Sequence, residues 1–133
     1  MNDEELLALA ASVRQNSFSP YSGFAVGAVL LGENDVAYAG CNVESASYGL
    51  TMCAERVALG NAVSSGCTHF TTVVVMTAAE QLTPPCGACR QLLWEFAPSA
   101  RVLLANTAGD VQEHTVASLL PHAFGASHLN SRS

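Results

Sequence analysis

The sequence predicts an α/β domain in which helices pack on the faces of a central sheet. The apolar, β-branched run at residues 70–77 is typical of a buried central strand. Segments with helical spacing alternate with strands through the middle of the chain, which favours a layered α/β arrangement. The 133 residues contain no repeat, linker or low-complexity stretch. We therefore expect a single domain over residues 1–133.

The first half of the chain predicts one helix and a hairpin. Residues 3–15 have apolar side chains at helical spacing and acidic residues in the first turn, which suits the helix dipole. The Pro, Ser and Gly of residues 18–24 predict a turn. Residues 24–32 and 35–43 are interpreted as strands, and the turn at Gly32–Asp35 makes them an antiparallel hairpin.

The second half alternates helices and strands. The pattern predicts a helix ended by Gly66, the strand 70–77, a helix stopped by Pro98, a strand at 100–106, a turn and short strand within 107–115, and a helix closed near Pro121. The two long helices, over 51–66 and 86–97, each follow a strand or loop directly. Both are expected to begin near one rim of the sheet, where ligands tend to bind in such folds.

The amino-acid composition indicates that part of the protein surface is covered by another chain, and it disfavours nucleic acid and anionic membranes as partners. Half of the residues are apolar and 12% are charged, against about 25% in an average domain. Association of identical copies would explain the difference most simply. The chain has five Arg, no Lys and a net charge of −6. It is therefore a poor partner for nucleic acid, where binding depends on cations, and for an anionic membrane surface.

The start of the chain and its apolar runs predict a cytoplasmic protein. The acidic N-terminus lacks the positive region of a secretory signal. The longest apolar runs are far shorter than the roughly 20 residues of a membrane helix. In the cytoplasm thiols stay reduced, and clustered cysteines more often bind metal or take part in chemistry than form disulfides.

Three cysteines and a glutamate form the candidate site. Cys86 and Cys89 are three residues apart and share one helix face. Cys53 lies near the start of the preceding helix, and two helix N-termini directed at one point would stabilise thiolates. Arg56 and Arg90 follow closely and could donate to the sulfurs.

Three protein ligands with one open position are typical of a catalytic zinc. Water at the open position would have its pKa lowered to about 7. Glu55, two residues after Cys53, would then be the carboxylate that moves a proton between this water and a substrate.

Two other interpretations of the cysteines stay open at this point. Cys86 and Cys89 alone could be a redox pair, or a fourth cysteine could close a structural zinc site. Cys67 is placed at the wrong end of its helix, about 20 Å from the start. Cys41 is harder to exclude, although a buried strand thiol is its simplest interpretation. The histidines at 69, 114, 122 and 128 have no ligand-like spacing and are taken as surface or structural residues.

These motifs resemble the zinc-dependent cytidine deaminase family. Its signature of a His or Cys ligand, a nearby Glu and a Pro-Cys-x-x-Cys segment corresponds to residues 53–55 and 85–89. The likeness extends to FSPYSGFAVGA, GCNVESASYGLTMCAER, PCGACRQLLWEF and LLPHAF, and covers most of residues 4–125. The all-cysteine ligand set and short chain resemble the homotetrameric branch.

The resemblance implies a three-layer α-β-α sandwich around a mixed five-stranded sheet and one Zn²⁺ per chain. It implies zinc ligation by Cys53, Cys86 and Cys89, and a proton shuttle at Glu55. It also implies hydrolytic deamination of cytidine and 2′-deoxycytidine to uridine and 2′-deoxyuridine in pyrimidine salvage, with the Pro84 carbonyl accepting from the departing ammonia.

The same resemblance implies a set of substrate-binding residues: Phe24, Asn42, Glu44, Ala46, Tyr48, Ala54 and Phe124. Phe24 would stack on the pyrimidine. Successive side chains of an extended chain point to opposite faces, so Asn42 and Glu44, two positions apart, face the same way. Together they could hold a ribose hydroxyl. Ala46, Tyr48 and Phe124 would come from neighbouring subunits of a homotetramer.

Other functions remain as alternatives. A deaminase of a modified cytosine nucleoside, such as blasticidin S, is disfavoured by Asn42 and Glu44, which suit a normal ribose. A non-catalytic, zinc-stabilised interaction module would have no use for Glu55. Editing of polynucleotides is disfavoured by the acidic charge.

Overall fold

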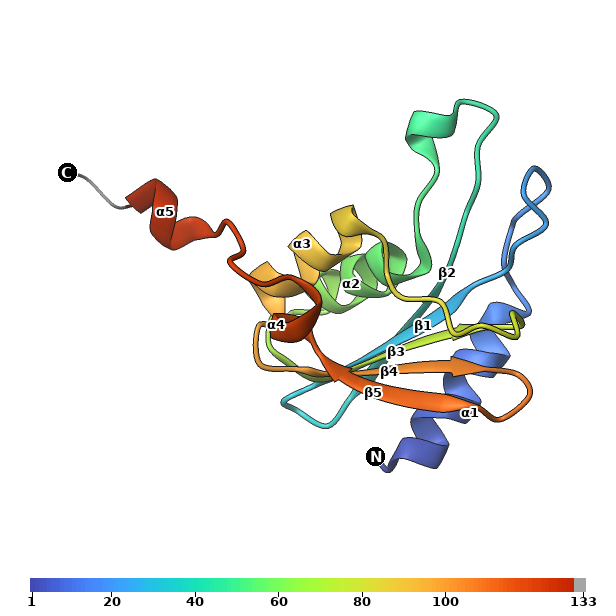
Figure 1. Ribbon diagram of the computed structural model, residues 1–133, viewed down its shortest axis with the longest axis horizontal. Helices are drawn as coiled ribbons and strands as arrows, with labels where there is room; N and C mark the ends of the chain where they lie inside the picture. The colour runs from blue at the N-terminus through green and yellow to red at the C-terminus, as the bar shows by residue number, and fades with distance from the viewer. Residues whose placement is uncertain (131–133) are drawn as a thin grey trace.

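A computed structural model describes residues 1–130, and its centre is a mixed five-stranded sheet (Figure 1). The strands are β1 (Gly27–Gly32), β2 (Ala37–Cys41), β3 (Phe70–Thr77), β4 (Arg101–Asn106) and β5 (Val111–Thr115). Their order across the sheet is β2-β1-β3-β4-β5. The pair β3 and β4 is parallel, and the remaining neighbours are antiparallel. The predicted hairpin and the predicted mixed sheet are confirmed.

Helices cover both faces of the sheet. Helix α1 (Asp3–Arg14) packs on one face, where Leu6 and Ala10 join the apolar side chains of β1, β3 and β4. Helices α2 (Ala54–Ser64) and α3 (Gly87–Phe96) pack on the other face. Because the buried residues of the sheet alternate between these two clusters, the predicted three-layer α-β-α sandwich is confirmed.

Two glycines bring helices unusually close to the sheet. A Cβ atom on Gly40 would lie 2.4 Å from the backbone nitrogen of Ala58 in α2. A Cβ atom on Gly27 would lie 2.2 Å from the carbonyl oxygen of Ala10 in α1. The absence of a side chain at Gly40 therefore sets how deeply α2 lies against β2.

The first strand begins later than predicted. Residues 24–26 were expected to belong to it, but β1 begins at Gly27. The chain before β1 is instead bound to residue 42: Phe18 N donates to the Asn42 carbonyl at 3.0 Å, and Val26 N donates to Asn42 Oδ1 at 2.9 Å. Backbone pairing continues for one step before β1, where Asn42 N donates to the Val26 carbonyl at 3.2 Å.

Three short helices complete the chain. They are the 3₁₀ turn η1 (Tyr48–Leu50), α4 (Val116–Leu119) and α5 (Ala126–Asn130). The sequence predicted α4 but neither η1 nor α5. The predicted domain span of 1–133 includes residues 131–133, which lie outside the described part of the chain.

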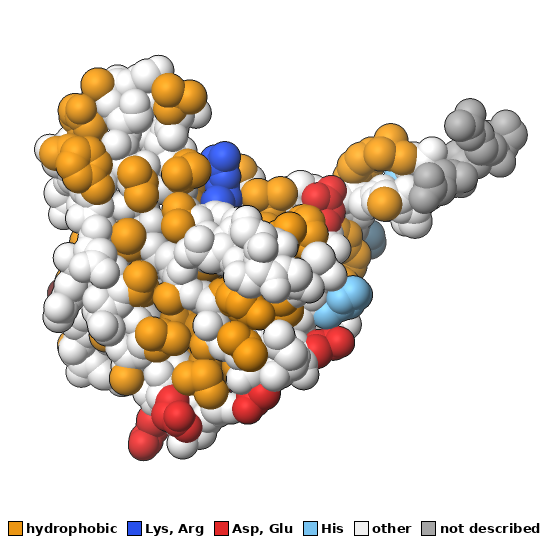
Figure 2. All heavy atoms as spheres, turned by 180° about the vertical axis from the view of Figure 1, so that it is seen from behind, with side chains coloured by type: hydrophobic (Ala, Val, Ile, Leu, Met, Phe, Trp, Pro, Cys, Tyr) orange, Lys and Arg blue, Asp and Glu red, His pale blue; other side chains and the backbone are white. Residues whose placement is uncertain are grey.

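Two segments project from the body. One is the loop of residues 45–51, which contains η1, and the other is the C-terminal arm of residues 120–130 (Figures 1 and 2). Both carry exposed apolar side chains: Tyr48 is 77% exposed, Leu50 71% and Leu129 69%. Within residues 1–130, no helix combines the length and apolar character needed to cross a bilayer.

Candidate metal centre

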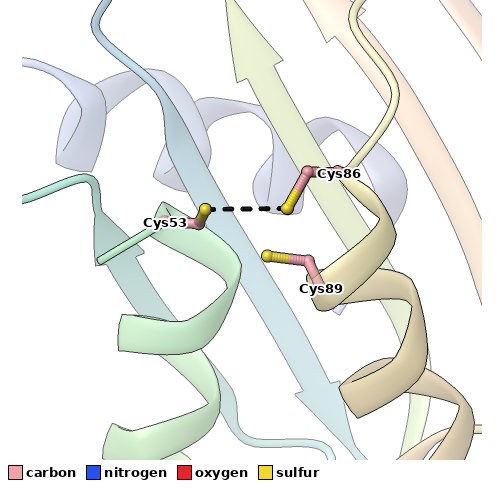
Figure 3. A group of neighbouring side chains, drawn as sticks. All are labelled: Cys53, Cys86 and Cys89. Carbon is pink, nitrogen blue, oxygen red and sulfur yellow. Dashed lines mark hydrogen bonds between the residues drawn. The ribbon is translucent and has the colours of Figure 1, made fainter. Parts of the chain in front are cut away.

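The three predicted cysteines meet where two helices begin (Figure 3). Cys53 is the N-cap residue of α2, Cys86 is the N-cap of α3, and Cys89 lies in the first turn of α3. The sulfurs lie within 4.8 Å of one another, and those of Cys53 and Cys86 are 3.8 Å apart. Their side chains point into one common space between the helices.

The donor set fits a zinc ion. Zn–S bonds of about 2.3 Å at tetrahedral angles place sulfurs about 3.8 Å apart, and thiolates are ligands that Zn²⁺ prefers. Cys89 is buried, Cys53 is half-buried and Cys86 is exposed, so the group is open toward solvent on one side. Within residues 1–130, Cys41 and Cys67 lie outside this group, which leaves the closed four-cysteine site without its fourth ligand.

The cysteines lie close enough for each to change the pKa of another. A hydrogen bond from Cys89, followed by one from Cys86 and the positive charge of Arg56, lowers the pKa of Cys53 to about 6. The same pairing with Cys53, together with burial, raises the pKa of the Cys89 thiol. These shifts have opposite signs because one sulfur acts as the acceptor and its neighbour as the donor.

Glu55 is buried beside this cluster. It lies in the first turn of α2 and is 6% exposed. Burial raises the pKa of its carboxyl, and the negative charge of Cys53 adds to that rise. A carboxyl group kept beside three sulfurs in a dry site is suited to carry a proton.

Glu55 lines a cavity of about 190 Å³, which we call the inner pocket. Its lining includes sulfur, carboxyl and amide groups from five segments of the chain: Val26, Asn42, Thr51, Met52, Cys53, Ala54, Glu55, Val75, Thr83, Pro84 and Cys86. Four of the predicted substrate or catalytic positions (42, 54, 55 and 84) therefore share one cavity.

A second cavity, the outer pocket, lies beside it. It has a volume of about 350 Å³ and is lined by Tyr21, Ser22, Glu44, Ser45, Tyr48 and Thr51. Thr51 lines both pockets, so the two are neighbours. The rings of Tyr21 and Tyr48 meet edge to face, with centroids 6.4 Å apart.

The Glu44 carboxylate is fixed by the loop at residues 21–22. It accepts hydrogen bonds from Tyr21 N at 3.0 Å, from Ser22 N at 3.1 Å and from the Ser22 hydroxyl. The Ser22 hydroxyl bond, with the two backbone bonds, holds the pKa of Glu44 below its usual range. The outer pocket thus contains a pre-oriented anion.

The Asn42 side chain is also fixed internally. Its Oδ1 accepts from Val26 N and from the Ser17 hydroxyl, and its Nδ2 donates to the Phe24 carbonyl at 2.8 Å. One N–H of the amide remains available in the inner pocket. Neither Ser17 nor Ser22 was predicted from the sequence, because serine is common in turns and nothing in its spacing distinguishes a supporting hydroxyl.

The remaining predicted residues are placed differently. Phe24 is 40% exposed and lines neither pocket. Ala46 is exposed in the loop of residues 45–51, and Phe124, in the C-terminal arm, is 56% exposed. Arg90 Nε donates to the Pro85 carbonyl at 2.8 Å, and its Nη1 donates to the Leu119 carbonyl at 2.9 Å.

Comparison with known proteins identifies the family. A model of the cytidine and deoxycytidylate deaminase zinc-binding region matches residues 1–105. The chain belongs to the zinc-dependent cytidine deaminase family. The match spans both cysteine segments and Glu55, and it agrees with the zinc-compatible donor set.

Cytidine deaminases from several bacteria are similar over almost the whole chain. The one from Sporosarcina psychrophila is 45% identical and covers 98% of this chain and 96% of its own length. The one from Halalkalibacterium halodurans is 44% identical, with shares of 98% and 99%. The chain is therefore a zinc enzyme of this family in its short form.

Solved structures agree with the fold. The crystal structure of cytidine deaminase from Burkholderia pseudomallei superposes with a TM-score of 0.89 at 40% identity. The superposition covers 93% of this chain and 100% of the Burkholderia pseudomallei chain. The mixed sheet with helices on both faces is therefore the fold of cytidine deaminases.

Proposed function

We propose that this enzyme hydrolyses cytidine and 2′-deoxycytidine to uridine and 2′-deoxyuridine with release of ammonia. The observation that carries this proposal is the cluster of three sulfur donors, two of which line the inner pocket together with the buried carboxyl of Glu55. The names of the similar proteins support the same substrate class. A zinc site that served structure alone would not need Glu55 beside it.

Cys53, Cys86 and Cys89 would hold the zinc, with Arg56 offsetting part of the negative charge of the thiolates. When bound, zinc lowers the pKa of a coordinated water to about 7 and so supplies a nucleophile at neutral pH. All other steps use groups of the chain itself.

Glu55 would move the protons. Its carboxyl is held in the inner pocket by the first turn of α2, next to Cys53. It would take one proton from the attacking water and place it on ring nitrogen N3 as the water oxygen adds at C4. It would then take the remaining proton of that oxygen and place it on the 4-amino group, so that the C4–N bond breaks and ammonia leaves. Pro84 lines the same pocket, and its carbonyl would accept a hydrogen bond from the departing ammonia.

The ribose would lie between the two pockets. Asn42 lines the inner pocket and has one N–H free to donate, while Glu44 lines the outer pocket and can accept. Together they would bind a ribose hydroxyl as both acceptor and donor. Ala54 would contact the pyrimidine from within the inner pocket, and Phe24 would stack on it after closing over the site.

The oligomer is part of the proposal. Ala46, Tyr48 and Phe124 lie on segments that project from the body. Tyr48 already lines the outer pocket of its own chain, and neighbouring copies would bring Ala46 and Phe124 to the pockets. A homotetramer would also cover the exposed apolar side chains of those segments. A role in pyrimidine salvage and a cytoplasmic location complete the proposal.

The decisive experiment mixes purified zinc-loaded protein with cytidine or 2′-deoxycytidine and follows the loss of cytosine absorbance. We expect activity in the wild type, and a fall in kcat of about 10²- to 10⁴-fold in Glu55→Gln with little change in KM. Zinc content should be unchanged in the variant. A zinc-loaded wild type that leaves both nucleosides intact would refute the proposal, and full activity in Glu55→Gln would refute the proton shuttle.

A further inference from the structure

Helix α3 does more than carry two cysteines, because the same helix holds the C-terminal arm. Its side chains at positions 90 and 91 follow Cys89 directly. Arg90 donates to the Leu119 carbonyl at 2.9 Å, and Gln91 Nε2 donates to the Phe124 carbonyl at 2.7 Å. Within residues 1–130, these two side chains donate the hydrogen bonds that α3 makes to the arm and to Leu119, the residue that precedes it.

A third residue of α3, Trp94, lies beside the arm at Gly125, the residue after Phe124. Gly125 is buried, and a Cβ atom placed there would lie 3.3 Å from Trp94 Nε1. Gln91 therefore holds the carbonyl of the Phe124–Gly125 peptide, and the Trp94 indole lies where a side chain at position 125 would be. Residues 91 and 94 lie on one face of the helix, so they act on the arm together.

The Phe124 ring is left outward while its backbone is fixed. The residue is 56% exposed, and among residues 1–130 its aromatic partner is His128 of the same arm, with centroids 5.4 Å apart. Leaving an aromatic ring in water gives up the stabilisation that its burial would provide. A fixed backbone with an outward ring is the arrangement expected of a residue that is presented to something else.

We propose that Gln91 is a positioning residue that fixes the Phe124 backbone on α3 and thereby sets how the Phe124 ring is presented to the nucleoside. This inference rests on the proposed function, in which Phe124 reaches the pocket of a neighbouring copy. Gln91 itself touches no reacting group. It acts through Phe124, and because α3 also bears Cys86 and Cys89, it ties the ring to the same helix that holds the metal ligands.

The test uses the zinc-loaded full chain and the near-isosteric variant Gln91→Met, which removes the donor. We expect KM for cytidine to rise about 3- to 10-fold, as loss of one ordering hydrogen bond allows, with kcat within about twofold. Gln91→Lys keeps a donor and should restore most of the loss. Gln112→Met, at an exposed glutamine of β5, is the matched control and should behave as wild type.

A double-mutant cycle separates positioning from general stability. If Gln91 acts through Phe124, Gln91→Met should change KM by less than about twofold when introduced into Phe124→Ala. Equal effects in both backgrounds would overturn the inference. An inactive wild type would instead refute the proposed function, so the two failures are distinct.

Helix α3 also carries a probe of the arm. Trp94 is the single tryptophan of the chain, and it lies beside Gly125, where a Cβ atom would come within 3.3 Å of its Nε1. Release of the arm should shift its emission to longer wavelength and make it more accessible to acrylamide, both in Gln91→Met and in a chain truncated after residue 120. An unchanged Trp94 spectrum in Gln91→Met, with a changed one in the truncated chain, would show that Gln91 does not hold the arm.

Discussion

The inner and outer pockets adjoin at Thr51 but are built in different ways. At the inner pocket the sulfur and carboxyl groups lie at the starts of two helices packed on the sheet. Glu55 is buried, and so is Cys89, which belongs to the sulfur group but does not line the pocket. In the outer pocket the groups lie on loops, and Tyr48 is 77% exposed. The packing of the core thus positions the reacting groups. The groups proposed to recognise the substrate are positioned by local hydrogen bonds and, in the proposed oligomer, by the neighbouring copies that cover the loops.

The largest effect is expected from removing a buried metal ligand beside the inner pocket. Cys89→Ser should lose zinc, and kcat should fall by about 10³-fold or more because the activation of water depends on the metal. Zinc per chain after dialysis and the rate of cytidine loss are the measurements. Cys41→Ser, outside the sulfur group, is the control that should keep its zinc. Zinc retained at full stoichiometry in Cys89→Ser would mean that the ligand set is wrong.

A smaller effect is expected where the core supports the inner pocket. In Gly40→Ala the new methyl group would lie 2.4 Å from Ala58 N and 2.8 Å from the Ala54 carbonyl. Pushing α2 off the sheet should lower the free energy of unfolding by about 1–3 kcal/mol. Since Cys53 and Glu55 start this helix, kcat should fall by about 10- to 100-fold.

Urea unfolding of the zinc-loaded protein measures the stability change. The matched variant is Gly60→Ala in the same helix, where a Cβ atom would contact nothing within 4 Å. It should raise the free energy of unfolding by about 0.5–1 kcal/mol. Equal destabilisation by both substitutions would show that close approach at Gly40 does not position the helix.

The smallest effect is expected in the outer pocket. Ser22→Ala removes the hydroxyl that orients the Glu44 carboxylate but leaves the two backbone N–H bonds to it. We expect KM for cytidine to rise by about 3- to 10-fold and kcat to stay within about twofold. Steady-state kinetics measure this, with Ser99→Ala at an exposed turn as control. A fall in kcat with unchanged KM would place Ser22 in the chemistry rather than in recognition.

The inner pocket was largely predictable from the sequence, because its geometry follows from local rules. The strand predicted at residues 70–77 is β3 (Phe70–Thr77). Helical spacing placed Cys86 beside Cys89, and the same helix starts brought Cys53 to them. Apolar periodicity, a strong signal in buried segments, predicted the alternation of helices and strands, whereas the mixed five-stranded sheet and its three layers were implied by the family resemblance.

The supporting contacts were not predictable, because they join residues far apart in the chain. Ser22 reaches Glu44 across 22 positions, and Gln91 reaches Phe124 across 33. Polar side chains such as these have no period or composition that marks a partner. Helices η1 and α5 were missed because three and five residues are too few to show helical periodicity. The proposed roles of the substrate-binding residues stay predictions.

The helix starts of the metal centre differ from that of α1. Asn2 caps α1 with a complete capping box, whereas Cys53 and Cys86 occupy N-cap positions and make no capping hydrogen bond with their side chains. A good cap contributes about 0.5–2 kcal/mol. Selection or design for thermal stability of the metal-free chain would therefore favour Ser, Asp or Asn at both positions and erase the centre. The two cysteine caps therefore forgo stability in the metal-free chain in exchange for metal ligation.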